Sequence, residues 1–212
     1  MDELNKINKR IKDEICYNTI KILDDNNLID EYIDCNSVKK EINKLEQILK
    51  LYIIEDDIIK NIINDYLLEL IPAGTKGIIR GNKFNTIVKN YIIKLNIDIN
   101  KYDIEFEKKC EFHITSEIPD WYILDKTSKK IIIGMNQLDL WNGGHQINRG
   151  FKYIENNKHN THNSKLLCVI CNDIYFKSNK NKIYKLFKIG FNNNTLTYLN
   201  NLGNIINSYF NL

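Results

Sequence analysis

One stretch, Ser116–Tyr153, restricts the fold more than any other part of the chain. Pro119-Asp120 opens an apolar run, and a short polar turn at Thr127-Ser128 separates this run from a second one that ends in amides. Two apolar runs on either side of a short turn are typical of a β-hairpin. The glycine pair Gly143-Gly144 then precedes a segment that we predict to be helical from about His145 to Glu155. We therefore expect a hairpin that leads into a helix, with polar groups where these elements meet.

The flanking patterns predict further elements on both sides of this stretch. An amphipathic helix is expected over Asn85–Leu95, and a strand over Tyr102–Ile114, where polar and apolar residues alternate. After the hairpin, the apolar run Lys165–Cys171 predicts a buried strand, and Lys182–Ile189 predicts another. The order of helix, three strands, helix and strand indicates an α/β (α+β) fold with a mixed β-sheet flanked by helices.

The amino-terminal third has a different character. Apolar residues at helical spacing predict helices over residues 3–23, from Ser37 to about Leu51, and over Glu55–Ile71, with Ser37 as a candidate cap. Pro72 ends this region, which holds 10 Lys+Arg against 16 Asp+Glu, a net of −6. The remainder holds 20 against 11, a net of +9. We therefore divide the chain into an acidic helical subdomain, residues 1–71, and a basic α/β domain, residues 72–212.

These charges and the hydropathy limit the partners. A basic carboxy-terminal domain suits a polyanion, although a merely solvated surface also explains the excess of cations. The acidic helices are open to packing, dimerisation or support of a DNA clamp. No apolar run approaches the ~20 residues that cross a bilayer, and the polar amino terminus is unlike a secretory signal. We expect a soluble, intracellular (cytoplasmic) protein without a membrane partner.

A glycine-rich run, GTKGIIRGNKF, follows Pro72. Glycines allow backbone N–H groups to approach an anion, and interleaved cations neutralise it. The run is therefore either a structural turn or a contact with a phosphate backbone. Its candidate DNA-binding residues are Lys76, Arg80 and Lys83.

Asp120 is the candidate metal ligand, because hydrolysis of a phosphodiester needs oxygen ligands for Mg²⁺. If the hairpin turn is centred between Thr127 and Ser128, Asp120 lies across from Met135, with Gln137 diagonal on the same face. A shift of one residue brings Gly134 and Asn136 there instead. In either register an amide arrives beside the carboxylate.

The order of these elements, with Pro119-Asp120 on the second strand and a polar cluster ending the third, resembles the PD-(D/E)xK nuclease superfamily. The runs GTKGIIRGNKF and DLWNGGHQINRGFKYI are most similar to type II restriction endonucleases within it, and the likeness covers roughly Pro72 to Gly190. This resemblance implies a restriction-endonuclease-like sheet and Mg²⁺-dependent, sequence-specific cleavage of double-stranded DNA. It also implies a homodimer and a cognate DNA methyltransferase as a partner.

The chain departs from that superfamily on the third strand, where an acid, one residue and a lysine are expected. Gly134-Met135-Asn136 and the adjacent windows lack this form. Asn136 or Gln137 would then fill the catalytic position beside Asp120, and Lys152 would supply the lysine.

Several acids are candidates for the missing one, namely Glu107, Glu117 and Asp139; we expect Glu117 and Gln137 as further metal ligands beside Asp120. The predicted helix after the glycine pair would contact DNA through Asn142, Gln146 and Arg149, with Arg149 taking a phosphate bidentately. Two alternatives remain: a DNA-binding protein that has lost catalysis, and a structural or interaction protein.

Overall fold

The computed structural model describes residues 14–53, 55–111, 117–137, 153–154, 163–170 and 182–212. Contacts divide the chain into two compact units. The helical unit spans Lys21–Lys83, and the sheet unit holds Phe84–Leu212 together with the described residues before Lys21. The division falls inside helix α7, Ala73–Lys94, whereas the charge pattern suggests a boundary at Pro72.

The helical unit is built from short helices that bury one apolar face each. Its elements are the end of α2 (Glu14–Ile22), the 3₁₀ helix η1 (Asp25–Leu28), α3 (Ile29–Ile33), α4 (Asn36–Leu49), α5 (Asp56–Asp65), α6 (Leu67–Leu70) and the first part of α7. Leu28, Tyr32, Val38 and Ile71 form its buried cluster. The helical character of this region agrees with the sequence pattern, since apolar residues recur every three or four positions.

Two local predictions in this unit are wrong. Ser37 does not cap α4: its hydroxyl hydrogen-bonds the Thr75 hydroxyl at 3.0 Å, and the cap position is Cys35, which makes no side-chain cap hydrogen bond. The helix predicted over Glu55–Ile71 is interrupted at Tyr66, which separates α5 from α6.

The glycine-rich run is helical, so its prediction as a structural turn is wrong, whereas its contact with a phosphate backbone stays a prediction. Gly74, Gly77 and Gly81 all lie within α7, and a β-carbon at any of them would meet nothing within 4 Å. Glycine lowers helix propensity by about 1 kcal/mol relative to alanine, but the surrounding apolar residues can outweigh this cost by packing.

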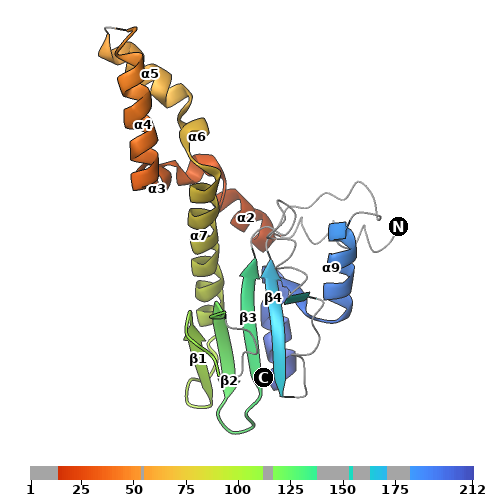
Figure 1. Cartoon of the computed structure of the whole chain (residues 1–212). Helices are drawn as coiled ribbons and strands as arrows, with labels where there is room; N and C mark the ends of the chain where they lie inside the picture. The colour runs from red at the N-terminus through yellow and green to blue at the C-terminus, as the bar shows by residue number, and fades with distance from the viewer. Residues whose placement is uncertain (1–13, 54, 112–116, 138–152, 155–162, 171–181) are drawn as a thin grey trace. The chain divides into compact units, whose positions relative to one another are not determined.

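The sheet unit contains one five-stranded mixed sheet in the order β1-β2-β3-β4-β5. Its strands are β1 (Tyr102–Phe106), β2 (Trp121–Asp125), β3 (Ile131–Gln137), β4 (Ser164–Ile170) and β5 (Leu196–Tyr198). The pairs β1–β2 and β2–β3 are antiparallel. The pairs β3–β4 and β4–β5 are parallel, and β3 and β4 point the same way in Figure 1. All of the last five residues of β4 are buried, as expected for a parallel strand between two neighbours.

Helices and the β2–β3 turn complete the described part of this unit. Phe84, Val88 and Ile92 form the buried stripe of the second part of α7. In the turn, the Asp125 carboxylate accepts the backbone N–H groups of Thr127 and Ser128, and these hydrogen bonds, the one from Ser128 most of all, hold the pKa of Asp125 below its ordinary value.

The carboxy-terminal part differs from its prediction. The strand predicted over Lys182–Ile189 is helix α9, Lys182–Asn192, because its apolar residues recur every three or four positions and do not alternate with polar ones. The chain then forms β5, the 3₁₀ helix η3 (Leu199–Asn201) and α10 (Leu202–Phe210), which the sequence pattern did not predict. Phe210 of α10 packs edge-on against Tyr102 of β1, with ring centroids 5.0 Å apart.

These elements confirm an α+β architecture with a mixed sheet and flanking helices. The predicted strand over Tyr102–Ile114 is shorter than expected and ends at Phe106. Most of the helix predicted over His145–Glu155 lies outside the described residues. In the part of the chain that the structure describes, no helix is long and apolar enough to cross a membrane.

Candidate functional site at the Asp120 end of the sheet

Asp120 lies immediately before β2, where the backbone turns into the sheet. Its N–H donates to the Gly134 carbonyl of β3 at 3.1 Å, and its carbonyl accepts the Glu107 N–H after β1 at 3.0 Å. The β2–β3 register pairs Trp121 with Gly134, and its continuation places Asp120 across from Met135. This is the register expected for a turn centred between Thr127 and Ser128.

A relay of side-chain hydrogen bonds converges on the Asp120 carboxylate. Asn85 of α7 donates from Nδ2 to Asp120 Oδ1 at 3.0 Å. The backbone N–H of Asn136 in β3 donates to Asp120 Oδ2. The Asn136 side chain in turn donates from Nδ2 to Asn85 Oδ1 at 3.1 Å, so the three residues form a closed ring of contacts.

The indole of Trp121 sets the orientation of both amides. Its Nε1–H, which can only donate, donates to Asn136 Oδ1 at 3.1 Å. The Asn136 Nδ2 group must therefore face Asn85, and the Asn85 oxygen must accept it. The remaining donor of Asn85 then points at the carboxylate. Because the indole can only donate, it determines the direction of the hydrogen bonds from Asn136 to Asn85 and from Asn85 to Asp120.

Gly134 explains why no acid stands on this part of β3. A β-carbon built on Gly134 would lie 1.8 Å from Trp121 Cε2 and 2.2 Å from Cζ2. Because Trp121 is buried with 1% of its surface exposed, its ring has little room to move. The indole therefore occupies the volume that an acidic side chain at this position would need.

Glu107 is the acid that the structure brings beside Asp120. The Phe106–Trp121 pair is the last of the β1–β2 register, so Glu107 follows opposite Asp120, as its backbone hydrogen bond also shows. Its φ of 49° is left-handed, which is uncommon for a residue other than glycine, and its side chain is exposed.

The other sequence-predicted site residues are distributed differently. Asn136 belongs to the relay. Gln137 ends β3 and is buried, paired in register with Ile170 of β4. Glu117 is half-buried, three residues before Asp120. Asp139, Asn142, Gln146, Arg149 and Lys152 lie outside the described residues.

In the helical unit, two of the predicted DNA-binding cations already have acidic partners. Lys76 Nζ lies 3.4 Å from Asp25 Oδ2, and Lys83 Nζ lies 2.9 Å from Glu31 Oε1. Arg80 lies near Tyr32, whose hydroxyl donates to Asp25 Oδ1 at 2.7 Å. All three cations therefore lie on α7, and two of them, Lys76 and Lys83, pair with acids of η1 and α3.

The atoms around Asp120 are mainly oxygen and nitrogen donors of carboxylates and amides. Cys168 of β4 is close enough for the Asp120 charge to act on it, but burial raises the pKa of its thiol, and the negative carboxylate raises it further. A thiol held protonated is a poor metal ligand. Among the described residues, no three His, Cys, Asp or Glu side chains gather as a metal-binding group.

Asn85 is the site residue that sequence analysis missed. It lies 35 residues before Asp120 and 51 before Asn136, and its position at the start of the predicted helix Asn85–Leu95 carried no chemical signal. The pairing depends on how α7 packs on the sheet. A comparison with family models, curated proteins and solved structures finds no match to this chain.

Proposed function

We propose that this protein is a Mg²⁺-dependent endonuclease that cleaves double-stranded DNA, with Asp120 at its catalytic centre. The observation that carries the proposal is the position of Asp120: it stands immediately before β2 against Asn136 of β3, on a mixed sheet. This is the arrangement that the resemblance to type II restriction endonucleases implies.

The residues present suit a hard cation. Mg²⁺ is usually held by one or two carboxylates and several waters, and Asp120 with Glu107 across from it would supply these carboxylates. When bound, Mg²⁺ would activate water and absorb the charge that develops on the phosphate.

The chain's own residues would position the carboxylate. Asn85 and the Asn136 backbone fix both Asp120 oxygens, so the carboxylate needs little reorganisation when a phosphodiester arrives. Lys76 and Lys83 could contact the DNA backbone only by leaving their ion pairs, of which the exposed Lys83–Glu31 pair is worth less than about 1 kcal/mol and the Lys76–Asp25 pair is partly buried. Contacts from Gln146 and Arg149, and the lysine role of Lys152, remain predictions from the sequence, as do the homodimer and the cognate methyltransferase.

The test is incubation of long duplex DNA with the protein and Mg²⁺, beside an Asp120→Ala variant. Loss of a metal ligand removes several kcal/mol of transition-state stabilisation, so we expect cleavage to fall more than about a thousandfold. Asp103→Ala is the matched control, because Asp103 makes an exposed ion pair with Lys126 on the neighbouring strand. Equal cleavage by wild type and Asp120→Ala would rule out the assignment.

A second candidate is a DNA-binding protein of the same architecture that does not cut. The observation that favours it is the Trp121 indole over Gly134, which leaves no room for an acid at the place where the superfamily carries one. This candidate predicts DNA retention at low salt, with log K falling by about 0.9 per phosphate contact as log salt rises, and no cleavage with any divalent cation. A protein that neither retains nor cuts DNA would instead support a structural or interaction role.

A further inference from the structure

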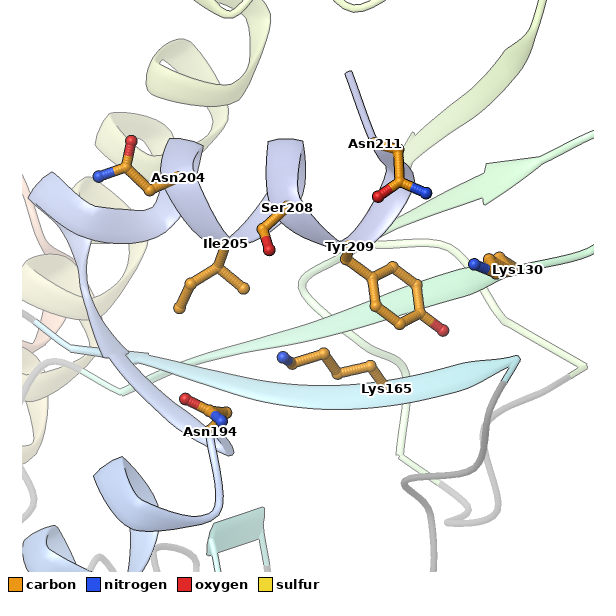
Figure 2. Close-up of a pocket in the computed structure, with 8 residues that line it drawn as sticks. All are labelled: Lys130, Lys165, Asn194, Asn204, Ile205, Ser208, Tyr209 and Asn211. Atoms are coloured by element: carbon orange, nitrogen blue, oxygen red, sulfur yellow. The ribbon is translucent and has the colours of Figure 1, made fainter.

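A cavity of about 450 Å³ opens in the sheet unit at the end of β3 and β4 that is opposite to Asp120. Lys130, which precedes β3, and Lys165 of β4 line it on the sheet side. Ser208 and Tyr209 of α10 line it from the other side (Figure 2). The cavity and the Asp120 relay lie at opposite ends of β3. The strand rises ~3.3 Å per residue, so Ile131 and Asn136 are about 16 Å apart along it.

The described residues that line this cavity include two cations, Lys130 and Lys165, and no acid. The ammonium groups of Lys130 and Lys165 lie 5.8 Å and 5.9 Å from the centre of the Tyr209 ring, and neither makes an ion pair with a described carboxylate. Burial lowers the pKa of Lys165.

The wall of the cavity also carries polar groups. The Tyr209 hydroxyl oxygen is buried and makes no hydrogen bond of good geometry with a described residue, although the Ile131 backbone lies close enough to act on it. Burial raises the pKa of Tyr209, and the Ile131 backbone opposes this effect. Asn194, Asn204 and Ser208 add amide and hydroxyl groups at the rim. Figure 2 shows the Tyr209 ring between the two lysines, with Lys165 extending beneath Ile205 and Ser208.

We propose that this cavity binds a small organic phosphate monoester, with the phosphate between Lys165 and the α10 side chains and the organic part in the remaining space. A monoester carries a charge of about −1.5 to −2 at neutral pH, which matches two lysines better than the single charge of a DNA phosphodiester does. A volume of about 450 Å³ exceeds the needs of free phosphate and falls in the range of small-molecule sites. Lys165 and Tyr209 are the main contacts, and Lys130 is secondary.

The probe is deoxyadenosine monophosphate, titrated into the full-length protein by calorimetry, with deoxyadenosine and inorganic phosphate as the two partial ligands. We expect saturable binding of the nucleotide, weaker binding of phosphate, and none of the nucleoside. Lys165→Gln should weaken nucleotide binding by about tenfold or more, since a charge-assisted hydrogen bond is lost, and Lys130→Gln by less. Lys185→Gln removes an exposed lysine of α9 outside the cavity and should leave affinity unchanged.

Two results would overturn the proposal. One is the absence of saturable nucleotide or phosphate binding to the wild type. The other is an affinity for the nucleotide that is unchanged in both Lys165→Gln and Lys130→Gln. Because Lys130 lies outside the strands, Lys130→Gln can be measured even if Lys165→Gln does not fold. If duplex DNA affinity falls in Lys165→Gln while the nucleotide does not bind, the cavity contacts polymer backbone and the monoester proposal is wrong. Because none of these readouts involves cleavage, they are independent of the test at Asp120.

Discussion

The two ends of the sheet treat their polar groups in opposite ways. At the Asp120 end, the carboxylate, two amides and the Trp121 indole are linked by hydrogen bonds of 3.0–3.1 Å and a backbone N–H. At the other end, Lys130 and Lys165 have no acidic partner among the described residues, and the Tyr209 hydroxyl has no hydrogen bond there. A network in which every polar group is hydrogen-bonded stabilises one arrangement of the chain. Buried polar groups without such partners are unfavourable, and a ligand that pairs with them would remove this cost. The same sheet therefore carries a rigid site and a receptive one.

The largest effect on stability is expected at Gly134, at the Asp120 end of the sheet, where the packing leaves no room for a side chain. Gly134→Ala would place a methyl group 1.8 Å from a ring atom of Trp121, which must shift and lose its hydrogen bond to Asn136. Overpacking of this severity should lower the free energy of unfolding by about 3 kcal/mol or more. Urea denaturation measures the loss.

Gly77→Ala is the matched control for this change. A β-carbon at Gly77 meets nothing within 4 Å, and the position is inside α7, so this substitution should raise stability by about 0.5–1 kcal/mol. If Gly134→Ala were as stable as Gly77→Ala, the indole would not be fixed over Gly134, and the account of the missing acid would be wrong.

An intermediate effect is expected from breaking the relay at its helical member. Asn85→Ala removes the donor to Asp120 Oδ1 and the acceptor for Asn136 Nδ2. Because these groups are only half-buried and water can replace part of the interaction, we expect a loss of about 1 kcal/mol in the free energy of unfolding.

Asn90→Ala makes the same change of residue type on an exposed position of α7 and corrects for helix propensity. A double-mutant cycle between Asn85→Ala and Asp120→Ala should give a coupling energy above about 0.5 kcal/mol. Additive losses would indicate that Asn85 does not hold the carboxylate in solution.

The smallest effect is expected at the receptive end. Tyr209→Phe deletes a buried hydroxyl that has no described partner, so stability should stay within about 0.5 kcal/mol of the wild type or rise. Tyr32→Phe offers the contrast, since the Tyr32 hydroxyl donates to Asp25 at 2.7 Å and its removal should cost about 1 kcal/mol. Thermal melting of both variants would compare them, and a larger loss for Tyr209→Phe would show that its hydroxyl is already satisfied.

The sequence was informative where a local pattern decides the structure. The hairpin was predicted with two registers left open, and the structure has the one whose turn is centred between Thr127 and Ser128. The parallel strand β4 was recognisable because burial on both faces demands a continuous apolar run. The helical character of the region before Pro72 followed from apolar spacing alone.

Local patterns were misleading where two structures share one signal. The run Gly74–Gly81 contains glycines and cations that suit a loop, yet its apolar neighbours also fit a helix, and packing decided for α7. The segment Lys182–Ile189 was predicted as a strand, yet its apolar residues have helical spacing, and it forms α9. Lys76 and Lys83 pair with acids of η1 and α3 that lie about 50 residues earlier in the chain, so their local pattern did not reveal these partners.

By itself, the sequence determined that Pro119-Asp120 opens a strand, that an amide follows on its neighbour, and that an acid-x-lysine pair is missing there. Only the tertiary structure decided that Asn85 completes the network and that Glu107 is the acid across from Asp120. It also revealed that the Trp121 indole fills the space over Gly134. The reason is physical: register and periodicity act over a few residues, whereas these contacts depend on packing between residues that are 13 to 51 positions apart in the chain.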